Sequence, residues 1–131
     1  MVPMLKLLSP LFLLVSLNSY AGWQMLFCDS TDQQGNCIGK SETFILSGAT
    51  VPLKVVLSNT EGIKTTKIYF EIYLVDPATF AEDLVATEEL KTEVNATVAF
   101  QALSLNRKGN YLIKARDSYK DYLTSRELTV K

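Results

Sequence analysis

The sequence predicts an all-β protein, an antiparallel sandwich of about seven strands. Apolar and polar residues alternate with a period of two in several runs, which is the pattern of strands that bury one face and expose the other. Turn residues separate these runs at spacings of about 8–12 residues, as in β-sandwiches. The chain has 131 residues, a length that suits one domain with one core. A closed barrel has similar strand spacing and is the alternative architecture.

The N-terminus has the layout of a secretory signal peptide. The chain starts with one positive charge, and residues 7–17 are almost entirely apolar. Ser19 and Ala21 then place small side chains three before and directly before the cleavage point, as such signals require. We therefore expect a signal peptide at residues 1–21 and a single β-sandwich domain at residues 22–131.

Export places the domain in a secreted or periplasmic compartment, where disulfides persist. A membrane-spanning helix needs roughly 18 or more apolar residues, but the apolar run here is shorter and contains Pro10. A lipoprotein needs a small residue before its modified cysteine, whereas Phe27 precedes Cys28. We expect no stable membrane insertion after signal cleavage.

Composition excludes several classes of function. The formal net charge is −1 at pH 7, so no basic excess exists to neutralise nucleic-acid phosphates. The chain contains no histidine, which removes Ser-His-Asp and Cys-His catalysis and the commonest zinc ligand. We expect a protein without catalytic residues, metal or cofactor.

The two cysteines, Cys28 and Cys37, flank a polar loop that contains Gly35. In an oxidising compartment such a pair indicates one local disulfide. Closing so short a loop stabilises a fold by roughly 2–3 kcal/mol on the chain-entropy model. We expect the bond to hold the N-terminal hairpin of the domain in place.

The first three predicted strands are short apolar or alternating runs. Trp23–Phe27 is apolar and precedes the loop between the cysteines, and Glu42–Leu46 ends at a Ser-Gly turn. Val51–Ser58 alternates apolar and polar residues, which indicates a half-buried strand. A turn at residues 59–62 follows it.

The clearest strand is Lys67–Val75, and Asp76 and Pro77 end it because proline lacks a backbone donor and restricts the residue before it. Its apolar face, which includes Phe70, alternates with an outward face that includes Tyr69. The predicted centre of the core consists of Val55, Phe70, Ile72, Phe100 and Ile113.

Residues 78–93 are ambiguous between a strand and a short helix, and the neighbouring strands favour a connector followed by an edge strand. Thr97–Leu103 is a further strand, with Phe100 on its buried face. Tyr111–Arg116 alternates after a turn, and Leu123–Val130 is the last strand.

The segment Gly109–Asp117 resembles the next-to-last strand of immunoglobulin-like and fibronectin-III-like domains. The resemblance implies that the hydroxyl of Tyr111 bonds to nearby backbone, forming a tyrosine corner. Ile113 stands where antibody-type domains carry a cysteine, and the central strand has no tryptophan. The resemblance is therefore to the wider sandwich superfamily, whose exported bacterial members often serve as binding, adhesive or assembly modules.

Four tyrosines are the candidate binding residues, because amphipathic aromatic side chains are enriched in recognition surfaces. Tyr69 and Tyr73 project from the outward face of the central strand, and Tyr119 and Tyr122 lie in or beside the loop before the last strand. We expect an exported, non-catalytic module that binds a protein or another envelope or extracellular macromolecule through a sheet face or loop.

Two alternatives remain open. The loop Asp29–Asn36, held by the disulfide, suits a small secreted or periplasmic enzyme inhibitor, because a rigid loop loses less entropy on binding. A hydrolase would instead need paired carboxylates around a cleft. The candidate carboxylates are Glu88, Glu89, Glu93, Asp117 and Asp121.

Overall fold

The computed structural model describes residues 22–131, and their regular structure consists entirely of strands. The predicted signal peptide lies outside the described residues. Among residues 22–131 there is no long apolar helix of the kind that crosses a bilayer. The strands are β2 (Trp23–Thr31), β3 (Cys37–Lys40), β4 (Thr43–Phe44), β5 (Val51–Asn59), β6 (Lys67–Val75), β7 (Glu82–Lys91), β8 (Val98–Leu105), β9 (Gly109–Arg116) and β10 (Tyr122–Val130).

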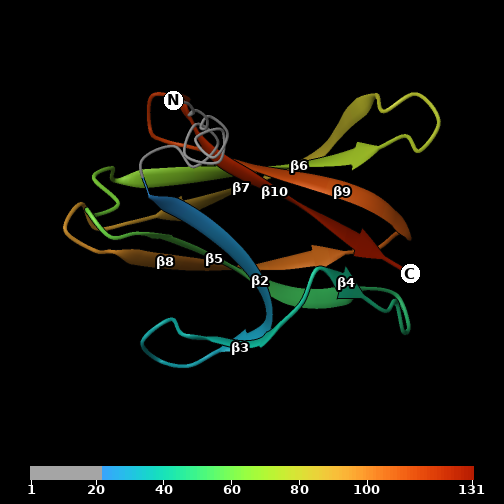
Figure 1. Ribbon diagram of the computed structural model, residues 1–131, viewed down its shortest axis with the longest axis horizontal. Coiled ribbons are helices and arrows are strands. Elements are labelled where there is room, and N and C mark those ends of the chain that lie inside the picture. The colour runs from blue at the N-terminus through green and yellow to red at the C-terminus, as the bar shows by residue number, and fades with distance from the viewer. Residues whose placement is uncertain (1–21) are drawn as a thin grey trace, which may run out of the picture.

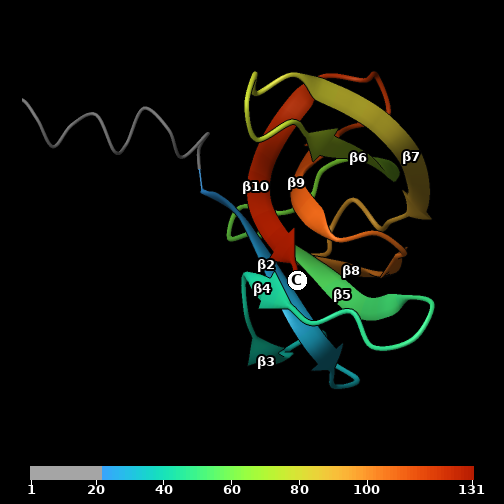
Figure 2. The same ribbon diagram turned by 90° about the vertical axis from the view of Figure 1, so that its right-hand side faces the viewer.

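The strands form two facing sheets (Figures 1 and 2). One has five strands in the order β4-β10-β9-β6-β7, and the other has four in the order β3-β2-β5-β8. All pairs are antiparallel except β4 with β10. The orders β2-β5-β8 and β10-β9-β6 are those of strands A-B-E and G-F-C in immunoglobulin domains. The predicted fold class, an immunoglobulin-like sandwich, is confirmed.

The strand count differs from about seven because the chain forms short additional strands at the sheet edges. Residues 78–93, ambiguous in sequence, contain the ten-residue edge strand β7. The expected strand Glu42–Leu46 shrinks to the two residues of β4, which pair in parallel with the end of β10.

The core lies between the two sheets, and four of its five predicted central residues are there. The exposed fractions of Val55, Phe70, Ile72 and Ile113 are 2% or less. The prediction for Phe100 is wrong, because Ala99 and Leu103 face the core and Phe100 lies on the opposite face of β8. Apolar residues occupy both faces of this strand, so its alternation does not specify which face is buried.

The predicted tyrosine corner is present at the start of β9. The hydroxyl of Tyr111 donates a hydrogen bond of 2.8 Å to the backbone oxygen of Arg107. Burial raises the pKa of Tyr111 above its ordinary value. The bond satisfies the hydroxyl of a buried ring and ties the β8–β9 turn to the sheet.

Candidate functional site

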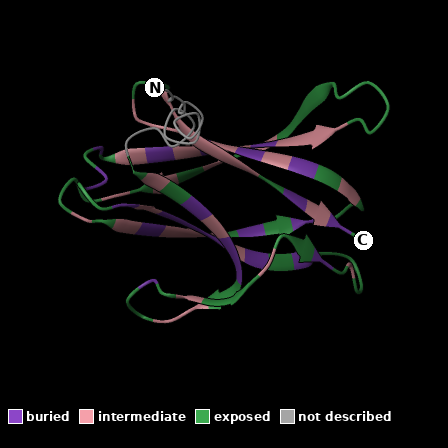
Figure 3. Cartoon of the chain, in the orientation of Figure 1, coloured by how far each residue is buried: buried purple, intermediate pink, exposed green. Residues whose placement is uncertain are grey.

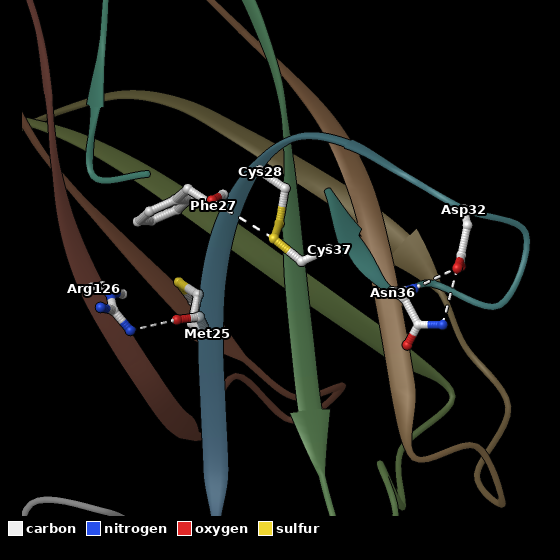
Figure 4. The surroundings of a disulfide bond; sticks show 7 residues. All are labelled: Met25, Phe27, Cys28, Asp32, Asn36, Cys37 and Arg126. Atoms are coloured by element: carbon white, nitrogen blue, oxygen red, sulfur yellow. Dashed lines mark hydrogen bonds between the residues drawn. A yellow bond between two sulfur atoms is a disulfide. The ribbon is translucent and has the colours of Figure 1, made fainter. Parts of the chain in front are cut away.

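The predicted disulfide between Cys28 and Cys37 is present, with 5.6 Å between the two Cα atoms (Figure 4). Phe27 is buried between the sheets, so Cys28 lies on the outer face of the four-stranded sheet, where it is fully covered. From there β2 leaves β5 and continues in its pairing with β3. The bond therefore holds the end of the β2–β3 hairpin close to the sheet.

The loop at residues 32–36 lies on the outer face of β8. Gly35 is buried, and a Cβ atom added to it would come within 2.9 Å of Val98 Cγ1 and 3.0 Å of Phe100 Cδ1. The loop thus covers the two apolar side chains that β8 turns away from the core. This contact is the physical reason why Phe100 is stable outside the core.

Asp32 shapes this loop by accepting backbone hydrogen bonds of 2.9 Å from Gln34 and Asn36 and another from the Asn36 side-chain amide (Figure 4). The side-chain amide of Asn36, followed by its backbone N–H, lowers the pKa of Asp32. No group of three or more acidic or cysteine side chains suited to a metal ion occurs within residues 22–131.

The outer face of the five-stranded sheet carries three of the four candidate tyrosines. Tyr69, Glu71 and Tyr73 alternate along β6 with buried residues and are themselves half-buried. Across the pair with β9, Tyr69 lies opposite Arg116, and Glu71 lies opposite Lys114. Aromatic, acidic and basic side chains therefore form one cross-strand array, which we call the tyrosine face.

Glu71 is the centre of the tyrosine face. Its Oε1 atom accepts hydrogen bonds from Arg116 Nε at 2.8 Å and from the Tyr73 hydroxyl at 2.9 Å. Burial raises the pKa of Glu71, but the hydrogen bonds from Arg116 and Tyr73 outweigh it, so that the pKa lies below its ordinary value. Burial, and then the bond to Glu71, raise the pKa of Tyr73. The carboxylate thus stays ionised and orients both neighbours.

Lysine ammonium groups lie over both tyrosine rings of β6. Lys114 Nζ is 4.7 Å from the centroid of the Tyr73 ring, and Lys120 Nζ is 4.4 Å from that of Tyr69. Lys67 Nζ lies 5.8 Å from the same Tyr69 ring. These are cation–π distances, and they restrict the rings without covering them completely.

Tyr122 and Tyr119 lie near the Tyr69 end of the same sheet. Tyr122 pairs with Arg116, and its hydroxyl is 2.8 Å from Ser125 Oγ. Tyr119, in the loop between β9 and β10, is 85% exposed. The structure therefore places Tyr69, Tyr73 and Tyr122 on one sheet, with Tyr73 farther along β6, and Tyr119 in the adjoining loop.

Sequence reasoning missed the charged partners of these rings. Glu71 and Arg116 are 45 residues apart, and only the register of β6 against β9 brings them together. The available signal for these partners was that Lys114 and Arg116 occupy alternate positions on the same outward face of one strand. The sequence does not show which residue pairs with an outward-facing charge until the strand pairing is known.

The carboxylates of the hydrolase alternative are dispersed. Glu88 and Glu89 lie opposite Phe70 and Tyr69, hence on opposite faces of β7. Asp117 uses its Oδ1 atom to accept backbone hydrogen bonds at the start of the β9–β10 loop.

No protein-family model and no curated protein sequence matches the chain. Among solved structures, it is similar to an immunoglobulin-like protein from Pseudomonas aeruginosa, with 12% identity over 86% of this chain and 99% of that one and a TM-score of 0.47. It is also similar to a superoxide reductase from Ignicoccus hospitalis, with 11% identity over 89% of this chain and 86% of that one and a TM-score of 0.46. A β-glucosidase from Listeria innocua is matched over 85% of this chain but 16% of its own length, with 15% identity and a TM-score of 0.45.

Proposed function

We propose that this chain is an exported, non-catalytic binding module. Its tyrosine face recognises a protein or another extracellular or envelope macromolecule. The observation that carries the proposal is the array of half-exposed tyrosines and cations held on one sheet by Glu71 and Arg116. Tyrosine and arginine dominate the energetic centres of protein interfaces. The disulfide supports export, because such bonds persist in oxidising compartments.

The tyrosine face is suited to binding because its side chains are already ordered. The Tyr73 ring is held by its hydroxyl bond to Glu71 and by the cation of Lys114. A partner that packs on rings restrained in this way loses less side-chain entropy than one that packs on freely rotating groups.

The test compares binding of the native partner, isolated from the envelope or extracellular fraction of the source, to the wild type and to the Tyr69→Ala, Tyr73→Ala double variant. The double variant should stay folded and bind at least tenfold more weakly, a change of about 1.4 kcal/mol. Ile38→Ala is the matched control, because Ile38 is 51% exposed but lies on the other sheet, in β3.

Unchanged affinity of the double variant would contradict the proposal that the tyrosine face is the binding surface. The same measurement with a variant of the disulfide loop, Gln33→Ala with Gln34→Ala, then tests the inhibitor alternative. These two side chains are exposed, and no side-chain hydrogen bond of theirs shapes the loop.

A further inference from the structure

The hairpin between β6 and β7 extends beyond the neighbouring strands and ends in an exposed loop (Figures 1 and 3). Phe80 in this loop is 75% exposed and has a backbone φ of 62°. The left-handed conformation is unfavourable for a bulky side chain, and glycine is the usual residue there.

Hydrogen bonds hold Phe80 in this conformation. Its N–H donates to the Asp76 oxygen at 2.8 Å, and the Asp76 N–H donates to the Ala81 oxygen at 2.9 Å. Asp76 Oδ1 accepts from the N–H groups of Ala78 and Thr79. The loop is therefore a closed turn that presents the phenyl ring outward.

The described domain compensates little for this choice of residue: Phe80 lines a hollow with Val75, Pro77 and Leu128, but it remains 75% exposed. An exposed ring gains little from packing, and glycine would fit the backbone better. Positions that break a local rule without a gain in the monomer are expected where a side chain serves a function. The ring of Phe80 is accordingly expected to pack against another molecule.

A hollow of about 490 Å³ lies beside the hairpin, between it and the β8–β9 turn. Leu74, Pro77 and Ala81 form apolar parts of its wall, and Arg107 and Lys108 lie on the turn side. A hollow of this volume can admit a phenyl ring. The same end of the domain thus carries both an exposed apolar anchor and a place to receive one.

The charges at this end are also complementary. The hairpin side of the hollow carries Asp76 and Asp83, whereas the turn side carries Arg107 and Lys108. Neither of these two bases forms an ion pair within residues 22–131. A copy rotated by a twofold axis would bring the acidic hairpin of each molecule to the basic turn of the other.

We propose that the chain forms a twofold-symmetric dimer in which Phe80 of each protomer enters the hollow beside the hairpin of the other. A surface that carries both an anchor and its receptor is self-complementary, as an isologous contact requires. The contact is small, so the association is weak and depends on concentration. It uses the end of the sheet away from Tyr119, and the hollow is lined by residues other than the tyrosines, Glu71 and Arg116 of the tyrosine face.

Sedimentation equilibrium of the exported protein at increasing concentration tests the proposal. The wild type should show a reversible monomer–dimer equilibrium. At a concentration where both proteins are monomeric, Phe80→Gly should raise the Tm, because the strained backbone is relieved. At higher concentration it should weaken dimerisation at least tenfold. Arg107→Glu with Lys108→Glu should weaken it as well.

Lys64→Gly is the matched control, because Lys64 has a φ of 60° but lies in the loop after β5. It should dimerise like the wild type. The proposal is overturned if the wild type stays monomeric up to millimolar concentration. This holds also if the monomer binds lipid vesicles or a different protein through Phe80. Dimerisation that Phe80→Gly leaves unchanged overturns it too, as does a lowered Tm of that variant at a concentration where both proteins are monomeric.

Discussion

Two hairpin loops of this domain share a design and differ in what they do with it. The β2–β3 loop begins at Asp32 and the β6–β7 loop at Asp76, and each aspartate accepts backbone hydrogen bonds that close the turn. Each loop also has a left-handed residue near its end, Gly35 in the first and Phe80 in the second. Gly35 is buried against β8, whereas Phe80 points into solvent.

The comparison shows that loops with similar turn geometry can have different roles. One packs against the domain and stabilises it, whereas the other exposes a side chain to solvent. In the disulfide loop, glycine is required twice, by its φ of 85° and by the lack of space for a Cβ atom. In the β6–β7 loop no such contact limits the residue, and the chain has a large apolar ring there. The disulfide loop therefore serves stability, while the β6–β7 loop presents a surface.

The largest effect is expected from removing the covalent restraint on the disulfide loop. Replacing both Cys28 and Cys37 by alanine should lower the free energy of unfolding by about 2–4 kcal/mol, because the unfolded chain gains freedom. Urea unfolding, followed by circular dichroism, measures the loss, and the native spectrum should remain all-β.

Reduction of the wild type provides the internal control for this prediction. A reducing agent should destabilise the wild type and leave the double variant unchanged. Equal stability of the two proteins under oxidising conditions would mean that contacts of Gly35 with β8 alone hold the loop, without help from the bond.

Exchanging the residue types at the left-handed positions should give effects of opposite sign. Gly35→Ala should cost about 1–3 kcal/mol, because it strains the backbone and forces Val98 or Phe100 to move. Phe80→Gly should stabilise the fold by about 0.5–1 kcal/mol. The relief of backbone strain is larger than the cost of the extra flexibility that glycine gives the unfolded chain. Thermal unfolding of both variants measures the contrast, and a loss of stability in both would show that the loops are not opposite in role.

The smallest effect is expected in acid. Hydrogen bonds from Asn36 lower the pKa of Asp32, and the backbone N–H groups of Ala78 and Thr79 lower that of Asp76, both from an ordinary value of 3.8. A carboxylate with a lowered pKa in the folded state stabilises the fold above the unfolded pKa and loses this contribution as the pH falls through the folded pKa. Both contributions should therefore decline as the pH falls past 3.8 and disappear only below the lowered pKa of each aspartate in the folded state.

A carboxyl titration by NMR measures the pKa values of both aspartates. Hydrogen exchange of the loop amides measures how far each loop opens as the pH falls. The β6–β7 loop should open further than the disulfide loop, because no covalent bond closes it. Asp76→Asn should remove the acid dependence of the β6–β7 loop alone, and a midpoint at or above 3.8 for either aspartate would contradict this account.

The central strand and the tyrosine corner could be predicted because their signals are local. In β6 every second residue is apolar, so Phe70 had to face the core once Tyr69 faced outward. The pairing of Cys28 with Cys37 needed only their number and the polar loop between them. The placement of Tyr69 and Tyr73 on an outer face followed from the same alternation.

The sequence by itself thus determined the fold class, the disulfide and the two faces of β6, since these depend on residues close together in the chain. Tertiary structure alone decided the place of Phe100, because the loop around Gly35 that covers it comes from a distant part of the sequence. It also decided the bond between Glu71 and Arg116. Alternation specifies which side chains share a face, but pairing register and long-range packing determine which atoms meet across it.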